Sequence, residues 1–457
     1  MIKDLIFLCD FGNTKANPAL LTVQQIIKET SLTTILNARF SDFLLEILNR
    51  DPLQPNPERL LALSADDWHE LTTEAVRYRL AFQVQQFIEG DSAFGGNVPQ
   101  ECLGQLGEIV RKTLMNNLRQ QAHLRQMLEA LNEADIPVIL LKGLWLGETI
   151  YRDLKARSTG DIDLLLRSED MPRFTKLVIE LGFDLPSNTA NICDLPPFTN
   201  EFPLIHPIRK SFFDIHWALT RTPVEKPVDE EKFWLRSEIY TIAGTPCRTL
   251  CMEDHLLYLC YHAAIHHRFN YVGPRALLDI ARLVDTPTRP IDWQDLVTRS
   301  RELGWDRGVW LMLNLARKHL GSQVPMTVLK ELSPAGGDDQ FIQSIAMDAL
   351  FLDQSQQDKL SINIVRMTEE RSLLKRAAVL FERLFPASEE IAIQFKTTVC
   401  TPGFRWLYFK RIGLLVKNHL LKIFLITVKN DTIMAEKDRL LAINRWIDAD
   451  AAHNQRI

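Results

Sequence analysis

Two aspartates in the segment STGDIDLLL, residues 158–166, have the spacing of a metal site. If the segment is a β-strand, Asp161 and Asp163 share one face while Ile162 and Leu164 share the other, because side chains alternate. Two carboxylates this close repel and raise each other's pKa unless a cation lies between them. Hard cations such as Mg²⁺ take oxygen ligands and leave positions open for phosphate oxygens. The pair therefore predicts a platform for in-line displacement at phosphorus.

A third carboxylate follows in the segment FFDIHW, residues 212–217. The same alternation puts Asp214 and His216 on one face of a second strand, so we expect Asp214 to join the first pair as a metal ligand. His216 would orient a carboxylate or contact a substrate, and a structural hydrogen bond explains it equally well. A bare D-x-D motif often marks two solvated acids at a strand edge, and the third acid favours the metal site instead.

Residues that could bind phosphate lie near these acids in the sequence. Lys142 and Gly143 come directly after an apolar run and before a predicted helix. Backbone N–H groups at a helix N-terminus, with a glycine that permits close approach, are typical of a phosphate site. Lys142 could add a point charge there. Arg157 and Ser158, shortly before Asp161, are further candidates for nucleotide contacts.

These side chains need a small sheet to hold them, and apolar runs bounded by turn residues predict its strands. The predicted strands cover residues 136–141 and 161–167, two segments within 202–220, and a hairpin around Ala243-Gly244. A turn followed by a helix is predicted over 142–152. A second helix is predicted over 171–183, because a proline lies in its first turn and a glycine near its end.

Helical periodicity dominates both flanks of this region. Apolar residues recur three and four apart over 32–50, 67–89 and 103–135, and again from Glu253 nearly to the end. We therefore predict an α+β protein, with a small mixed-sheet core and large all-helical N- and C-terminal flanks. The predicted units are a helical N-terminal region at 1–102, the core at 103–250, a helical domain closing the cleft at 251–385, and a C-terminal helical region at 386–457.

Composition is that of an ordinary globular protein. The 457 residues carry a formal net charge of -5, and 46% of them are hydrophobic. Seven scattered cysteines, an odd number in a long chain, argue against a disulfide framework and favour a reducing compartment. The N-terminal sequence lacks the features of a signal peptide, and no window of about 18 apolar residues predicts a membrane span. We expect a cytoplasmic protein.

The order of the motifs resembles that of the uncharacterised nucleotidyltransferase family, within the polymerase-beta-like superfamily. The matching motifs are Lys142-Gly143, Tyr151 to Asp153, Arg157, the run from Gly160 to Leu165, and the run from Asp214 to Trp217. The resemblance extends from about Asp67 to Val284, and its downstream helices carry His262, His266 and Asp279.

This resemblance implies a reaction and roles for the residues. Asp161 and Asp163 would bind divalent metal, Mg²⁺ or Mn²⁺, and Asp214 would bind the catalytic ion and act as a general base. A nucleoside triphosphate, with ATP as the expected donor, would transfer its nucleoside monophosphate to a hydroxyl of a small molecule, peptide or protein. Pyrophosphate would leave. His262 and His266 share a helix face and would line the cleft, and a buried hydrogen-bonded pair explains them equally well.

Two other functions compete with this one. Leu144 stands where superfamily members usually have glycine or serine, which motivates a catalytically weak nucleotide-binding or protein-interaction module on the same fold. A nucleic-acid polymerase or tRNA-modifying enzyme would need a basic groove, and the nearly balanced charge gives it little support.

Two further segments carry residues of functional types. Three cysteines precede three histidines between Cys247 and His267, but their spacing matches no common zinc site. The segment 404–429 is apolar, aromatic and basic. It would contact a membrane surface or a partner, although apolar helical faces more often pack on the body of a protein.

Overall fold

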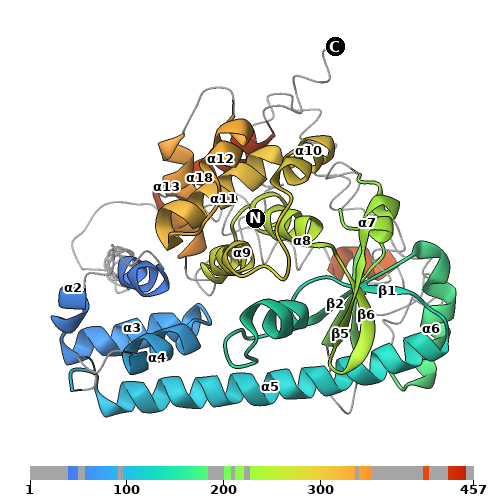
Figure 1. Cartoon of the computed structure of the whole chain (residues 1–457), viewed down its shortest axis with the longest axis horizontal. Coiled ribbons are helices and arrows are strands. Elements are labelled where there is room, and N and C mark those ends of the chain that lie inside the picture. Colours follow the sequence, from blue (N-terminus) through green and yellow to red (C-terminus); the bar gives the residue numbers. More distant parts are fainter. Residues whose placement is uncertain are drawn as a thin grey trace, which may run out of the picture.

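The computed structural model describes most of the chain between residues 40 and 352 and two segments beyond it. The described residues are 40–49, 57–90, 94, 96–183, 200–206, 212–220, 227–334, 339–352, 405–410 and 431–448. Helices surround one mixed sheet, so the predicted α+β class is confirmed (Figure 1).

Six strands form the sheet. They are β1 (Val138–Leu140), β2 (Ile162–Leu166), β3 (Glu201–Ile205), β4 (Phe212–His216), β5 (Glu238–Ile242) and β6 (Thr245–Thr249). Their order is β3-β4-β2-β1-β6-β5. The pairs β2–β4 and β1–β6 are parallel, and the other neighbours are antiparallel. Every residue of β1 and β2 is buried, as their aliphatic sequences predict for central strands.

Helices precede the sheet in the chain. After a helix over residues 40–48, they are α2 (Pro57–Leu61), α3 (Ala65–Arg77), α4 (Ala81–Gly90) and α5 (Gln100–Glu133). The long α5 contacts α3 and α4 in its first part and α6 (Met171–Glu180) and β6 further along. It runs along one side of the molecule from the N-terminal helices to the sheet (Figure 1).

The predicted helix over 67–89 is two helices in the structure. Arg79 adopts φ 60°, and the Leu80 N–H donates to the Ala75 carbonyl at 2.7 Å. The Arg79 N–H donates to the Val76 carbonyl at 3.1 Å. These two bonds form a Schellman motif, which ends α3. Apolar spacing alone misses this break, because the hydrophobic period continues through it.

Short elements connect the strands. They are the π-helix η3 (Leu146–Tyr151), the 3₁₀-helix η4 (Ser168–Asp170), α6, and α7 (Glu230–Arg236). The predicted helix over 142–152 is thus mainly a π-helix, and the predicted helix over 171–183 is confirmed as α6. The predicted hairpin is also confirmed, with Ala243 at φ 52° and Gly244 at φ 78° between β5 and β6. Two positive φ values are typical of a two-residue hairpin turn.

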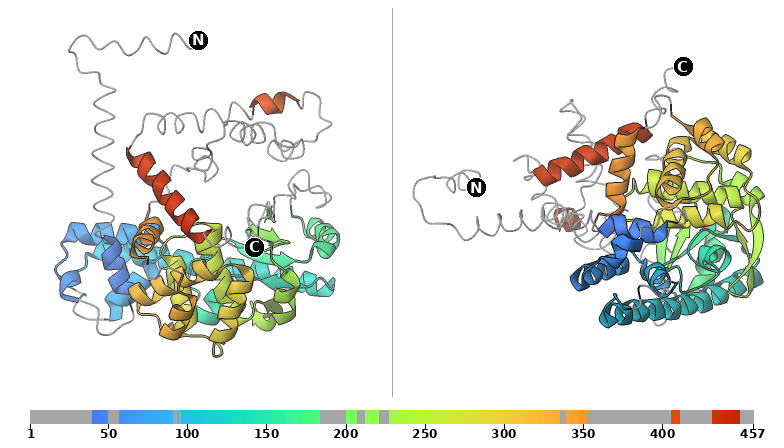
Figure 2. Two further views of the ribbon diagram at one scale, coloured as in Figure 1. Left: turned by 90° about the horizontal axis from the view of Figure 1, so that it is seen from above. Right: turned by 60° about the vertical axis from the view of Figure 1, so that its left-hand side comes forward.

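The C-terminal helices form a second helical region. They are α8 (Met252–Cys260), the π-helix η6 (Tyr261–His266) that continues it, α9 (Arg275–Asp285), α10 (Trp293–Leu303), α11 (Asp306–Leu320), α12 (Met326–Leu332), α13 (Gln340–Leu350) and α18 (Asp431–Ile447). Helix α11 is central, because α8, η6, α9, α10, α12 and α13 all pack on it. Helix α18 packs against α13, and Figure 2 shows it at one side of this region.

The described part of the chain contains no helix that is both long and apolar enough to cross a membrane. Of the segment 404–429, only the helical residues 405–410 are described, with Trp406 and Phe409 exposed. The rest of that segment lies outside the described residues, so its predicted membrane or partner contact stays a prediction.

Candidate active site

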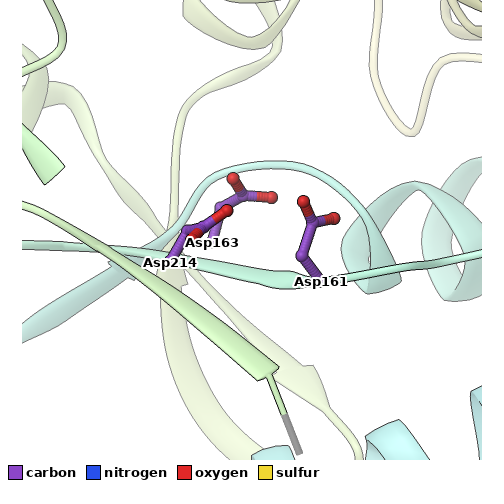
Figure 3. A group of neighbouring side chains, drawn as sticks. All are labelled: Asp161, Asp163 and Asp214. Atoms are coloured by element: carbon purple, nitrogen blue, oxygen red, sulfur yellow. The ribbon is translucent and has the colours of Figure 1, made fainter. Parts of the chain in front are cut away.

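Three aspartates meet on two neighbouring parallel strands. Asp163 on β2 lies beside Asp214 on β4 in the strand register, and Asp161 directly precedes β2. One carboxylate oxygen from each lies within 4.8 Å of the others. Figure 3 shows the three carboxylates clustered on one side of the strands. Within the described ranges, no other group of histidine, cysteine or acidic side chains has this geometry.

Asp163 is the buried centre of this triad, with 1% of its surface exposed. The Lys142 Nζ lies 2.9 Å from Asp163 Oδ1, and the His216 Nε2 lies 3.3 Å from the same atom. Although burial raises the pKa of Asp163, Lys142 and His216 together hold it well below its usual range. Asp163 Oδ2 is buried and has no hydrogen-bond partner among the described residues. An ionised oxygen in that state fits a metal ligand.

Burial and repulsion within the cluster raise the pKa values of the other two acids, Asp214 and Asp161. Burial and then the charges of Asp163 and Asp161 raise the pKa of Asp214 to about 7. Burial and the charge of Asp163 also raise the pKa of Asp161. A divalent cation among the three oxygens would relieve this repulsion, so the donor set fits Mg²⁺ or Mn²⁺.

A cavity of about 330 Å³ opens above the triad. Its walls come from the α3–α4 turn, the segment 157–160, the start of β3, the end of α8 with η6, and α9. The structure brings all of the predicted site residues to this cavity, namely Lys142, Gly143, Arg157, Ser158, Asp161, Asp163, Asp214, His216, His262 and His266. The size and the convergent polar groups are those of a small-molecule site.

Lys142 points at the triad. Besides Asp163, its Nζ lies 3.1 Å from His262 Nε2. Burial and the charge of Lys142 hold the pKa of His262 well below its ordinary value, so neutral His262 accepts a hydrogen bond from Lys142. Because neutral His262 carries no charge, the ammonium of Lys142 balances the charge of Asp163. The adjacent Gly143 has φ 65°, and a Cβ there would lie 3.3 Å from Thr159 Cγ2, so this turn requires glycine.

Arg157 forms a buried ion pair across the site. Its Nε and Nη2 each lie 2.9 Å from a carboxylate oxygen of Asp279 on α9, and its Nη1 donates to the Gly143 carbonyl at 3.2 Å. The Tyr151 hydroxyl donates to Asp279 Oδ1 at 2.8 Å. All three nitrogens of the guanidinium are thus bound within the protein. Arg157 joins the segment before Asp161 to α9.

Comparison with known proteins agrees with this geometry. A family model described as uncharacterised nucleotidyltransferase matches residues 64–321, more than half of the 457 residues. The chain belongs to this nucleotidyltransferase family. The matched range includes the triad and every wall of the cavity. No similarity to a curated protein or to a solved structure was found.

Side-chain amides hold the segment before the triad in this member of the family. Asn117 of α5 accepts a hydrogen bond from the Thr159 N–H at 3.1 Å and donates to the carbonyls of Leu154 and Arg157, each at 2.7 Å. Gln120 donates to the Gly160 carbonyl at 3.1 Å. Because each bond fixes a backbone group, α5 acts as a rigid support for the approach to Asp161.

Sequence reasoning missed these supports and two arginines of the cavity. Asn117 and Gln120 lie on the buried side of α5, and polar residues inside an amphipathic pattern are the signal that could have found them. Arg79 and Arg275 also line the cavity. Nothing in the local sequence of either arginine marks it, because each reaches the site through the packing of distant helices.

His216 and the π-helices complete the surroundings. The Nδ1 of His216 lies 3.2 Å from Glu201 Oε2, so His216 stands between β3 and Asp163. Its position favours orientation of Asp163. Both π-helices border the site, since η3 ends at Tyr151 and η6 carries His262 and His266. π-Helical turns are frequent at functional sites because they widen the helix and shift the side chains that follow.

Proposed function

We propose that the protein is a metal-dependent nucleotidyltransferase that transfers AMP from ATP to a hydroxyl group of an acceptor and releases pyrophosphate. One observation carries the proposal. Three carboxylates meet below a polar cavity, and the central one presents a buried oxygen that lacks a partner in the described structure. Membership of the nucleotidyltransferase family supports the same reaction class.

Asp161, Asp163 and Asp214 would hold the divalent ions. When bound, such ions neutralise charge on the transferring phosphoryl group and align the reacting oxygens. Lys142 and His216 keep Asp163 ionised and oriented for this role. The remaining contribution of the protein is positioning, as in phosphoryl transfer generally.

Asp214 is the proposed general base. The acceptor hydroxyl oxygen attacks the α-phosphorus, its proton passes to Asp214, and the bond from the α-phosphorus to the pyrophosphate oxygen breaks. Burial beside two like charges raises the pKa of Asp214 to about 7 in the metal-free protein, and a bound cation would lower that pKa and keep Asp214 ionised, the state that can accept a proton.

The test measures metal and nucleotide binding before it asks for turnover. Calorimetry with Mn²⁺ and each nucleoside triphosphate should show binding to the intact protein, and Asp161→Asn and Asp163→Asn should lose it. Asp66→Asn, an exposed acid on α3, is the matched control and should bind as the unaltered protein does. Absence of metal and triphosphate binding by the intact protein would overturn the proposal.

A measurement of pyrophosphate release then distinguishes an active enzyme from a nucleotide-binding module. With a panel of hydroxyl acceptors, the intact protein should release pyrophosphate and Asp214→Asn should not. Binding without release across the whole panel would favour the nucleotide-binding module. One observation favours that second candidate. Leu144 is buried in the core, so this turn presents no hydroxyl to a phosphate.

A further inference from the structure

Two arginines lie in the cavity beside Asp161. Arg275, the first residue of α9, is partly buried, and its Nη1 donates to the Ser158 carbonyl. Arg79, in the turn between α3 and α4, has its Nη1 3.6 Å from the place where a Cβ on Gly160 would lie. Both guanidinium groups therefore flank the segment 158–160, which leads directly into Asp161.

These two differ from the other lysine and arginine side chains of the cavity. Lys142 is paired with Asp163, and Arg157 is paired with Asp279. Arg79 and Arg275 have no ion pair among the described residues. A guanidinium without a carboxylate, in a cavity wall beside a metal site, is ready to bind an anion, because its planar fork matches phosphate oxygens.

The pairing of Arg157 with Asp279 explains why Arg275 forms no ion pair in the described structure. Asp279 lies four residues after Arg275 on α9, where the two side chains are neighbours on the helix surface. Both carboxylate oxygens of Asp279 are taken by Arg157, and one also accepts from Tyr151. Arg157 thus occupies the acid that would otherwise neutralise Arg275.

The backbone of Arg79 points to the same function. It occupies the left-handed position of the Schellman motif, with φ 60°, where glycine is usual. A non-glycine residue is unfavourable there and persists when its side chain has another use. The side chain of Arg79 is exposed, makes no ion pair in the described structure, and lines the cavity.

We propose that Arg79 and Arg275 bind the β- and γ-phosphates of the nucleoside triphosphate, beside the segment 158–160. The inference rests on the proposed function, and it assigns the sides of the site from which pyrophosphate leaves and the acceptor enters. The attacking and leaving oxygens lie in line across the phosphorus. Pyrophosphate therefore leaves toward α9, and the acceptor hydroxyl enters from the side of Asp214 and β3.

Inorganic tripolyphosphate with Mg²⁺ is the probe, because it has no base and tests the phosphate contacts directly. We expect calorimetry to show roughly tenfold to a hundredfold weaker binding in Arg79→Gln and in Arg275→Gln, the loss of one charge-assisted contact. AMP, which lacks both distal phosphates, should bind each variant within about twofold of the unaltered protein. Arg111→Gln, an exposed arginine of α5 outside the cavity, is the matched control and should change neither affinity.

The outcomes distinguish this inference from the proposed function. If the intact protein binds neither tripolyphosphate nor a non-cleavable ATP analogue with Mg²⁺, the proposed function fails. If it binds both, and the two variants match it or the control loses as much as they do, the arginine assignment alone is overturned. Circular dichroism checks folding. Should Arg275→Gln unfold, Arg79→Gln decides, because its side chain is exposed and makes no side-chain contact that the structure records.

Discussion

At the scale of single residues, we expect Asp214 to link metal binding to pH. Its pKa of about 7 in the metal-free protein means that it is mostly protonated below that pH. A bound cation needs the carboxylate, so binding must displace this proton. We expect Mn²⁺ affinity to fall about fivefold from pH 7 to 6, to approach tenfold per pH unit below pH 6, and to level off above pH 8.

The measurement is a Mn²⁺ titration followed by electron paramagnetic resonance at several pH values. Asp214→Asn provides the control, because it removes the titrating group and should give a weaker affinity with little pH dependence between 6 and 8. An affinity of the intact protein that stays constant over that range would contradict the assignment.

Arg79 predicts a conflict between stability and function. Glycine suits its left-handed backbone better, so Arg79→Gly should raise the free energy of unfolding by about 1 kcal/mol. The same change removes a proposed phosphate contact and should weaken triphosphate binding. Thermal unfolding and calorimetry on one preparation test both effects. A variant that loses stability would show that the arginine side chain supports the fold.

At the scale of elements, helix α5 and the segment 154–160 form one unit. Asn117 is 1% exposed and satisfies three backbone groups of that segment. Asn117→Leu leaves these buried groups without partners, at a cost of about 2–4 kcal/mol in the free energy of unfolding. Metal affinity should fall as well, because Asp161 follows this segment directly.

The partner variant for this test is Asn116→Ala. From a less buried position, Asn116 donates to the Thr159 carbonyl at 2.7 Å and accepts from the exposed Arg119 guanidinium at 2.7 Å. Its loss should cost about 1 kcal/mol. Chemical denaturation gives both values, and equal losses for the two variants would contradict the central role of Asn117.

Particular elements show how far the sequence could predict this site. Alternation in 158–166 and 212–217 places the three acids on matching faces, and the parallel pairing of β2 with β4 brings them together. The partners of the positively charged side chains Arg157 and Lys142 could not be predicted in this way. Asp279 is 122 residues from Arg157, and His262 is 120 residues from Lys142. Only tertiary packing decides whether a lysine or arginine side chain is available to a phosphate or is paired with an acid of the protein.

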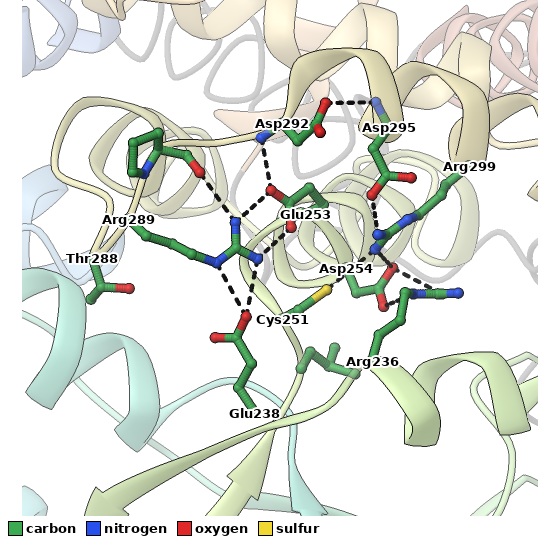
Figure 4. Close-up of polar contacts among 12 residues, drawn as sticks. Arg236, Glu238, Cys251, Glu253, Asp254, Thr288, Arg289, Asp292, Asp295 and Arg299 are labelled. Carbon is green, nitrogen blue, oxygen red and sulfur yellow. Dashed lines mark hydrogen bonds and ion pairs between the residues drawn. The ribbon is translucent and has the colours of Figure 1, made fainter.

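At the scale of the whole molecule, two adjacent acids join the C-terminal helices to the sheet. Glu253 and Asp254 begin α8 (Figure 4). Arg289 binds Glu253 at 2.6 Å and also Glu238 of β5 at 3.0 Å. Asp254 binds two arginines, Arg236 at the end of α7 and Arg299 of α10. These pairs fix the first turn of α8, and the end of the same helix forms part of the cavity wall.

Asp254 is completely buried, so its removal should be severe. Asp254→Asn removes the buried charge that Arg236 and Arg299 share, and we expect a loss of about 3–5 kcal/mol in the free energy of unfolding. Asp295→Asn is the control. It also contacts Arg299 but is 37% exposed, so the loss should be no more than about 1 kcal/mol. Denaturant titration of both variants checks the difference, and a mild effect of Asp254→Asn would contradict the anchoring role.

The residues that line the cavity extend in the sequence from Arg79 to Asp279. Some of them therefore precede the strands of the sheet in the chain, and others follow them. A fragment cut to the sheet alone, such as residues 103–250, would keep the three acids and lose both arginines that we assign to the leaving group. Exchange of this sheet between relatives would therefore transfer the three aspartates without the two arginines. A fragment that keeps the complete cavity must therefore include at least residues 79–279.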